Sequence, residues 1–213
     1  MGFMFINIFK RKKKEILSLD ELLSVELNVK NKLFERYGWP ISKDVVREQM
    51  NLDIQTLDLS PDIEAILQPS CSEEKNGEIL VNRLYEDDGE FEYMHEVIHY
   101  IIDIGVGKKV DKEFRRKHSE NSSDAHEREI DSTAAATLIP IFLLLHDIDR
   151  YRKNIWLTDE VAFMQELREK YSCSQACLEK RFKEVHRLKK DKHRLNMLRT
   201  EYEKKKDILK QVM

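Results

Sequence analysis

The sequence has few residues that break helices or cross-link a chain. Among its 213 residues there are six glycines, four prolines and three cysteines. Because glycine and proline are scarce, tight turns are few and long helical stretches are expected. The odd, sparse set of cysteines gives no disulfide framework and fits a reducing compartment. Of the three, Cys71, Cys173 and Cys177, we expect the last two to be ordinary buried or half-buried residues.

The chain also lacks a long hydrophobic run and a large net charge. Its N-terminal apolar run, Met1–Phe9, is far too short to span a bilayer, which takes about 20 residues. A basic cluster follows that run instead of preceding it, which is the wrong order for a secretory signal. The formal net charge is −3, so no global attraction to nucleic acid is indicated. We therefore expect a cytoplasmic protein with no transmembrane segment and no direct nucleic-acid binding.

The composition is that of a globular protein, with 41% hydrophobic and 36% charged residues. Helical periodicity, short apolar runs and turn signals predict a mixed α+β fold. The expected helices cover residues 16–37, 43–50, 91–103, 125–145, 159–171 and 174–185. A small sheet of about three strands is expected from residues 53–59, 63–67 and 78–84, and residues 107–124 are predicted to be a loop.

Three parts of the chain differ in composition and in the pattern of their apolar and charged residues. Residues 1–15 form an apolar and basic segment, residues 16–185 a folded domain, and residues 186–213 a basic amphipathic helix. From residue 180 to the end there are thirteen Lys or Arg against five Asp or Glu. The apolar positions in this stretch approximate a heptad seam, which favours packing on the body or against a second chain. Phosphate binding by the basic residues is the weaker reading of the same pattern.

The sharpest signal is the sequence His95-Glu-Val-Ile-His99. On a helix, residues four apart lie one above the other, so both imidazoles can bind one metal ion from one face. Glu96 is offset from His95 by roughly 100°, from where it can reach the open metal position and act as the general base. The apolar surroundings make two surface histidines and a helix glutamate the weaker interpretation.

A catalytic zinc needs a third protein ligand and one free position. Position 105 is glycine, so a histidine six residues after His99 is absent and the ligand must come from elsewhere. We favour Glu127, with Asp131 four residues on to accept the N–H of a ligating histidine. Glu129, His126 and His118 stay open as alternatives, and carboxylates at a helix start are favourable without any metal. Two histidines and a carboxylate suit zinc or, less often, iron.

At this point the chain resembles the ImmA/IrrE family of zinc metallopeptidases, whose members combine an HExxH helix with a later helix containing the third ligand. The second block here is Glu127-Arg-Glu-Ile-Asp-Ser-Thr-Ala-Ala-Ala-Thr-Leu-Ile-Pro140, and it departs from the family pattern at Ile130 and Thr133. Seven positions match, namely Glu127, Glu129, Asp131, Ala134, Ala135, Leu138 and Pro140. Upstream, residues 79–82 resemble the family's edge strand and Phe91 an aromatic before the motif.

The resemblance covers roughly residues 20–185 and implies a zincin-like fold with a small sheet beside the HExxH helix. It implies Zn²⁺ at His95, His99 and Glu127, with Glu96 as base. The implied activity is cleavage of a regulatory protein, such as a helix-turn-helix repressor of a prophage or other mobile element.

Two further readings are weighed against a peptidase. A non-proteolytic regulator that keeps the fold and binds a partner is the first alternative, although such a module does not need a base at Glu96. The second alternative is a nucleic-acid-binding protein in which the basic residues of 180–213 contact phosphate. A dimer or partner contact through residues 186–213 is another interpretation of the same tail. The residue that stabilises the transition state is not chosen by spacing, and Tyr93, Tyr100, His118 and His126 are the candidates.

Overall fold

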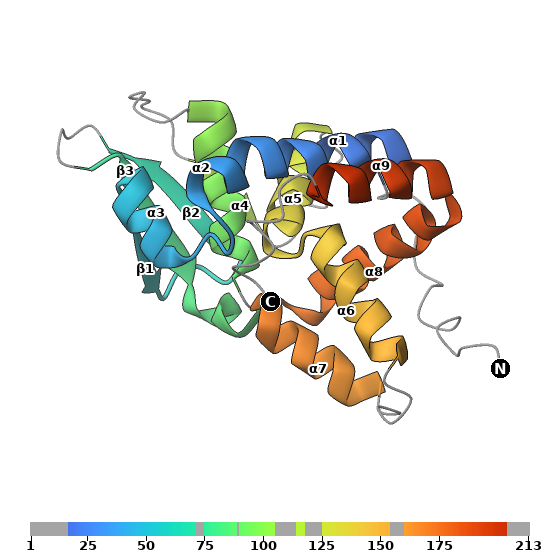
Figure 1. Cartoon of the computed structure of the whole chain (residues 1–213). Coiled ribbons are helices and arrows are strands. Elements are labelled where there is room, and N and C mark those ends of the chain that lie inside the picture. The colour runs from blue at the N-terminus through green and yellow to red at the C-terminus, as the bar shows by residue number, and fades with distance from the viewer. Residues whose placement is uncertain are drawn as a thin grey trace.

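The computed structural model describes residues 17–70, 75–88, 90–104, 114–117, 125–153 and 160–203. Its architecture is α+β and mostly helical, as predicted, with a small mixed sheet on one side of a helical body (Figure 1). The predicted N-terminal segment 1–15, residues 204–213 of the tail and Cys71 lie outside the described residues.

The first helical run covers residues 19–37, close to the prediction. It comprises α1 (Leu19–Asn28), the π-helical segment η1 (Val29–Phe34) and the short α2 (Glu35–Tyr37). A capping box starts it, in which the Ser18 side chain accepts from the Glu21 N–H and Glu21 accepts from the Ser18 N–H. Helix α3 (Lys43–Met50) follows, with Ser42 as its N-cap.

The sheet has the strand order β1-β3-β2-β4. Strands β1 (Leu52–Leu57), β2 (Ile63–Pro69) and β3 (Gly77–Asn82) were predicted, whereas β4 (Phe114–Lys117) falls in the stretch expected to be a loop. Strand β3 pairs parallel with β1 and antiparallel with β2, and β4 pairs antiparallel with β2. The four residues of β4 have no apolar alternation, so only pairing with a strand distant in sequence reveals them.

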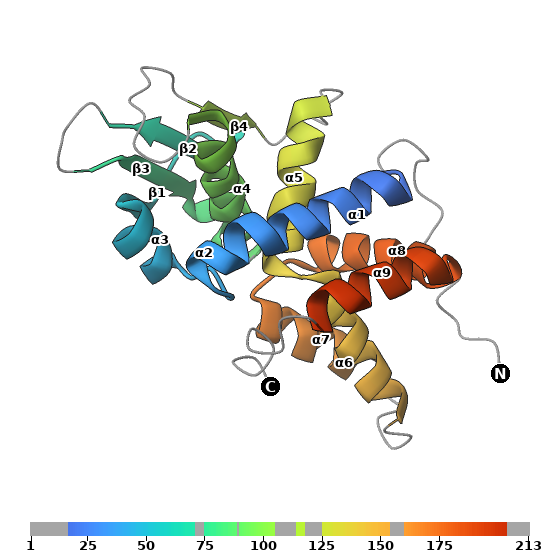
Figure 2. The ribbon, with the colours of Figure 1, turned by 45° about the horizontal axis from the view of Figure 1, so that its top comes forward.

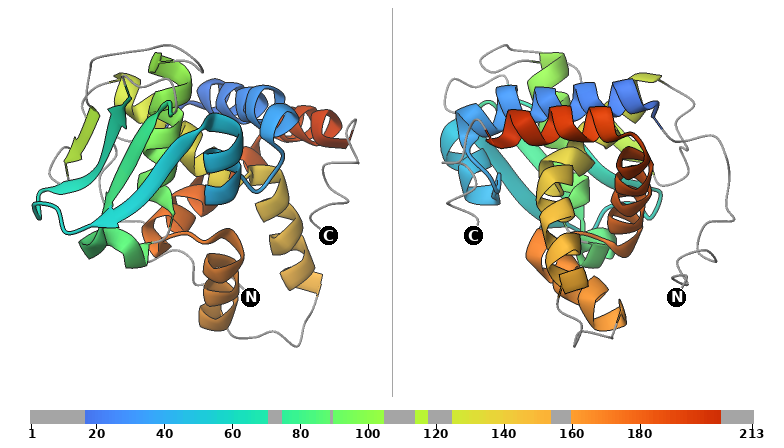
Figure 3. Two further views of the ribbon diagram at one scale, coloured as in Figure 1. Left: turned by 90° about the vertical axis from the view of Figure 1, so that its left-hand side faces the viewer. Right: turned by 45° about the vertical axis from the view of Figure 1, so that its right-hand side comes forward.

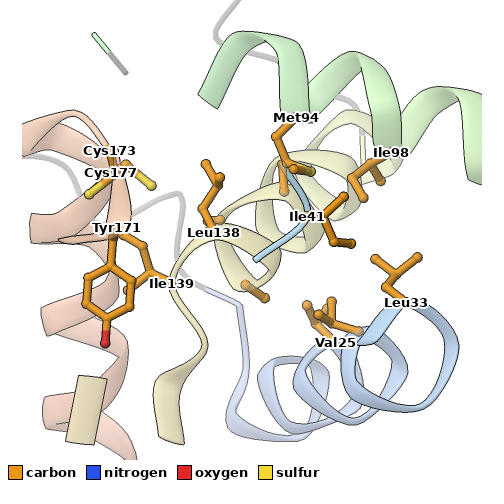
Figure 4. Packing of buried hydrophobic residues seen from close by; sticks show 14 of the residues in the cluster. Val25, Leu33, Ile41, Met94, Ile98, Leu138, Ile139, Tyr171, Cys173 and Cys177 are labelled. Atoms are coloured by element: carbon orange, nitrogen blue, oxygen red, sulfur yellow. The ribbon is translucent and has the colours of Figure 1, made fainter. Parts of the chain in front are cut away.

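Helix α4 (Phe91–His99) contains the HExxH motif and continues into the π-helical segment η3 (Tyr100–Ile104). Every residue of α4 from Glu92 to His99 is buried. The helix packs against β2 and β3 of the sheet and against α5 (Ala125–Leu138), which Figure 2 shows beside it. Met94 and Ile98 of α4 meet Val25 and Leu33 of the first helical run in the core (Figure 4).

The helical segment predicted over residues 125–145, with Pro140 inside it or ending it, consists of two helices. α5 ends at Leu138 and α6 (Ile141–Lys153) begins after Pro140, whose ring and missing N–H prevent a continuous helix. Among the described residues no single helix is long and apolar enough to cross a membrane. The two helices meet those criteria only together, as a pair bent by 49°, and many of their apolar side chains lie in the core.

A fully buried arginine fastens the junction between α5 and α6. Arg181 donates from Nε to the Ile139 carbonyl at 2.9 Å and from its two terminal nitrogens to the Glu26 and Glu184 carboxylates. Glu26 in turn accepts the backbone N–H of Ile141 at 3.1 Å. The network joins α1, the bend and α8 (Gln175–Lys190), and it therefore connects the bend between α5 and α6 to two other helices.

The C-terminal part departs from the predicted boundary at residue 186. Helix α8 runs on to Lys190, and α9 (Lys192–Glu203) then lies alongside α1 (Figure 3). The seam residues Leu188, Leu195, Leu198 and Tyr202 are buried within the same core as the rest of the chain. In the described part of the tail, the apolar seam considered for a dimer contact is therefore covered by the body of the same chain.

Several basic side chains of the tail are paired with the body as well. Arg194 binds Asp20 of α1 at 2.7 Å, and Lys189 binds Asp149 of α6 at 3.2 Å. Arg187 donates to the Leu17 carbonyl. These contacts account for part of the positive charge that the sequence concentrates after residue 180.

Helix α7 (Glu160–Tyr171) precedes the two cysteines that were expected to be ordinary buried or half-buried residues. Cys173 and Cys177 are both buried and both free thiols. Burial raises the pKa of each to about 12, which suppresses the reactive thiolate at neutral pH.

Replacing Arg181 tests the buried network. Arg181→Met leaves Glu26 and Glu184 buried without their cation, and we expect a loss of about 3–5 kcal/mol in the free energy of unfolding by urea denaturation. Arg199→Met is the matched control, because Arg199 forms a half-exposed pair with Asp149 that contributes at most about 1 kcal/mol.

The pH dependence of that loss gives a second readout. Burial raises the pKa of the Glu26 carboxyl, and the Arg181 guanidinium opposes this rise. Without the arginine the folded-state pKa lies still further above the unfolded value, so the folded variant binds more protons and regains stability on acidification. The deficit of Arg181→Met should shrink as pH falls from neutrality, and a deficit that grows would contradict a buried, uncompensated carboxylate.

Candidate metal centre

The two histidines of the motif face each other one turn apart on α4. Their Nε2 atoms are 3.0 Å apart, and the side chains of His95 and His99 are 2% and 5% exposed. This follows from the four-residue spacing on a helix that is buried between the sheet and α5. The arrangement gives two imidazole nitrogens directed at one point, shielded from solvent.

Glu127 brings a carboxylate to the same point from the first turn of α5. Its Oε2 atom is 3.4 Å from the Nε2 atom of His95 and 3.4 Å from that of His99. The packing of α5 on α4 therefore places two nitrogens and one oxygen close enough to hold a metal ion. Of the third-ligand candidates that the structure describes, Glu127 is the one whose carboxylate lies near the Nε2 atoms of both histidines.

A carboxylate lies close to the Nδ1 atom of each histidine, opposite the Nε2 atom that faces the other ring. Asp131 Oδ1 lies 2.9 Å from His95 Nδ1, and Asp103 Oδ2 lies 2.7 Å from His99 Nδ1. An imidazole that donates its Nδ1–H to a carboxylate keeps its Nε2 lone pair for the metal. The role predicted for Asp131, to accept the N–H of a ligating histidine, requires such a contact with an imidazole nitrogen.

Asp103 was not identified from the sequence, although it lies four residues after His99. It belongs to η3, where the helix widens into a π-helical turn. Its other oxygen, Oδ1, is 2.8 Å from His126 Nε2 on α5. The spacing His99-x-x-x-Asp103 is the signal that would have pointed to it.

The protonation states in the site suit metal binding. Contact with His95 is the largest influence that lowers the pKa of Glu127, so its carboxylate is ionised at neutral pH. Burial lowers the pKa of His99, and the hydrogen bond to Asp103 opposes this, so the neutral imidazole dominates at pH 7. Ionised carboxylate and neutral imidazole are the forms that coordinate metals.

The other candidates occupy different places. Glu129 is exposed and is not one of the residues grouped around the two Nε2 atoms. His126 forms a second potential metal-holding group with His99 and Asp103. His118 lies outside the described residues.

Glu96 directly follows His95 on α4 and is almost fully buried, with both carboxylate oxygens shielded from solvent. Of the tyrosines considered for transition-state stabilisation, Tyr93 donates to the Ile41 carbonyl at 3.0 Å and is fixed in the core. Burial raises the pKa of Tyr93 above its ordinary value, so this phenol stays protonated. Tyr100 is fully buried at the start of η3.

Comparison with known proteins adds no relative. No protein-family model matches the chain, and no curated protein matches it.

Removing the carboxylate behind His95 should weaken metal binding. We expect Asp131→Ala to raise the dissociation constant for Zn²⁺ by about 10–100-fold, because the imidazole loses the partner that fixes its tautomer. Competition with a chromophoric chelator measures the constant. Glu129→Ala, which removes the same charge two residues away from an exposed side chain, is the matched control. Equal effects of the two substitutions would refute a specific role for Asp131.

Proposed function

We propose that the protein is a zinc-dependent peptidase. The observation that supports this best is the convergence of His95 Nε2, His99 Nε2 and Glu127 Oε2, with Glu96 directly after His95 on the same helix. Two imidazoles and one carboxylate form the ligand set of one class of catalytic zinc peptidases, and three protein ligands leave a coordination position open.

The donor chemistry favours zinc over the other common divalent ions. Imidazole nitrogens suit zinc, copper, iron and nickel, whereas magnesium and calcium prefer all-oxygen sites. A 2-His-1-carboxylate set also occurs in non-haem iron proteins, so iron is the principal competitor. The glutamate adjacent to the first ligand favours zinc, because hydrolysis requires a base beside the metal.

Each residue then has a defined task in peptide hydrolysis. When bound, zinc polarises the substrate carbonyl and lowers the pKa of a water molecule. Glu96 takes a proton from the attacking water and returns it to the leaving amine, as a general base and then a general acid. Asp131 and Asp103 hold the imidazoles of His95 and His99 in the ligating tautomer.

The arrangement of elements supports a zincin-like assignment and membership of the ImmA/IrrE family. The motif helix α4 lies against a small sheet, and a later helix, α5, supplies the third ligand. On this basis we propose a cytoplasmic enzyme whose substrate is a regulatory protein. A helix-turn-helix repressor of a prophage or other mobile element is the substrate that the resemblance suggests.

Metal content tests the ligand set. The untagged protein should hold close to one zinc per chain by elemental mass spectrometry, and His99→Ala and Glu127→Ala should lose it. Glu129→Ala should keep it, because this exposed side chain is not part of the site. A wild-type chain that holds no zinc even after reconstitution would contradict the proposal.

Substitution of the base separates metal binding from catalysis. Glu96→Gln should retain zinc but lower the rate of peptide hydrolysis by about 10²–10⁴-fold, because the amide cannot accept the proton. Cleavage of a mixed peptide library, followed by mass spectrometry, measures the rate. Glu48→Gln on α3, an exposed glutamate, is the control. Zinc binding with no cleavage by the wild type would favour the non-proteolytic, partner-binding regulator instead.

A further inference from the structure

The Asp103 carboxylate lies between two histidines from different helical segments. Its Oδ2 atom is 2.7 Å from His99 Nδ1, and its Oδ1 atom is 2.8 Å from His126 Nε2. The rings of His99 and His126 are 6.0 Å apart, centre to centre. One carboxylate thus connects a metal-facing histidine of α4 with the beginning of α5, through η3.

The contact between His126 and Asp103 also bears on Glu127, because His126 is its neighbour in the chain. His126 is the residue before Glu127 and lies in the first turn of α5, which begins at Ala125. Backbone N–H groups in the first turn of a helix lack partners within the helix, and helix ends fray. The 2.8 Å contact between His126 Nε2 and Asp103 Oδ1 joins this turn to η3, and with it Glu127, whose carboxylate faces His95 and His99.

We propose that Asp103 and His126 are positioning residues for the metal centre. Asp103 fixes the imidazole of His99 with Nε2 toward the metal. His126 donates to the other oxygen of Asp103, which holds that carboxylate in place and keeps Glu127 within reach of the two histidines. The inference rests on the proposed function, since it assigns these residues to the zinc site.

The same residues also form a group that could hold a metal ion of its own. We interpret the contacts of Asp103 with His99 and His126 as hydrogen bonds and not as a second metal site. A neutral imidazole has one nitrogen that accepts a hydrogen bond and one that donates. When His99 Nε2 faces the first metal, its Nδ1 carries the proton and cannot ligate a second. The 2.7 Å distance to Asp103 fits an N–H donor against a carboxylate.

A double-mutant cycle tests the proposal on the full chain, with Zn²⁺ as the probe and chelator competition as the measurement. Asp103→Ala should raise the dissociation constant by about 10–100-fold, as the loss of a carboxylate behind a metal-binding histidine does. His126→Ala should have a smaller effect. The double variant should bind no more weakly than Asp103→Ala alone, because His126 acts through Asp103.

Two further variants separate positioning from general damage to the fold. His126→Gln keeps a side-chain N–H donor and should restore binding relative to His126→Ala. His146→Ala on α6 removes an exposed histidine outside the site and should leave the dissociation constant unchanged. Urea unfolding of each protein without metal verifies that every variant is folded.

The possible results distinguish this inference from the proposed function. A wild-type chain that binds no zinc overturns both. The positioning role would be overturned if Asp103→Ala left zinc binding unchanged. It would also be overturned if the losses in binding free energy from Asp103→Ala and His126→Ala added up in the double variant. Either result would leave the peptidase proposal standing. Two zinc ions per chain, with one lost in His126→Ala, would assign these residues to a second metal site instead.

Discussion

Two buried imidazoles on one helical turn need a partner for each ring nitrogen, because an unsatisfied polar group away from water is costly. In this protein the two Nδ1 atoms face the carboxylates of Asp131 and Asp103. The two Nε2 lone pairs converge with the Glu127 carboxylate, and a metal ion between these three acceptors would satisfy them. The partners come from three helical segments: α4, η3 and α5. The arrangement of these segments is therefore tied to the hydrogen-bonding requirements of His95 and His99.

The rest of the fold provides a rigid support for that arrangement. The sheet covers part of α4, and the apolar residues of α1 and α5 complete the core around it. The bend at Pro140 ends α5, and the buried Arg181 secures both sides of the bend through Ile139 and Glu26. Because a site residue displaced by about 1 Å loses much of its effect, such support matters as much as the ligands themselves.

The sequence is informative where the signal is local. The four-residue spacing of His95 and His99, the run of apolar neighbours and the carboxylate pair at Glu127 and Asp131 follow helical periodicity, and the structure brings these four residues together. Three strands and most helices were predicted for the same reason, since each has its own pattern or cap.

The features that were missed depend on contacts between distant residues. β4 becomes a strand only by pairing with β2, and the extent of α8 depends on its packing within the core. Asp103 is an exception, because its four-residue spacing from His99 is a local signal, and only its contact with His126 of α5 depends on how separate helical segments pack. The buried Arg181 network likewise joins residues 155 positions apart.

Anomalous diffraction at the zinc absorption edge, from crystals of the protein grown with Zn²⁺, tests the central claim most directly. The account predicts one strong peak about 2.0–2.1 Å from the Nε2 atoms of His95 and His99 and at a similar distance from a Glu127 oxygen. A peak elsewhere in the chain, or none near these three residues, would contradict a zinc centre on the motif helix.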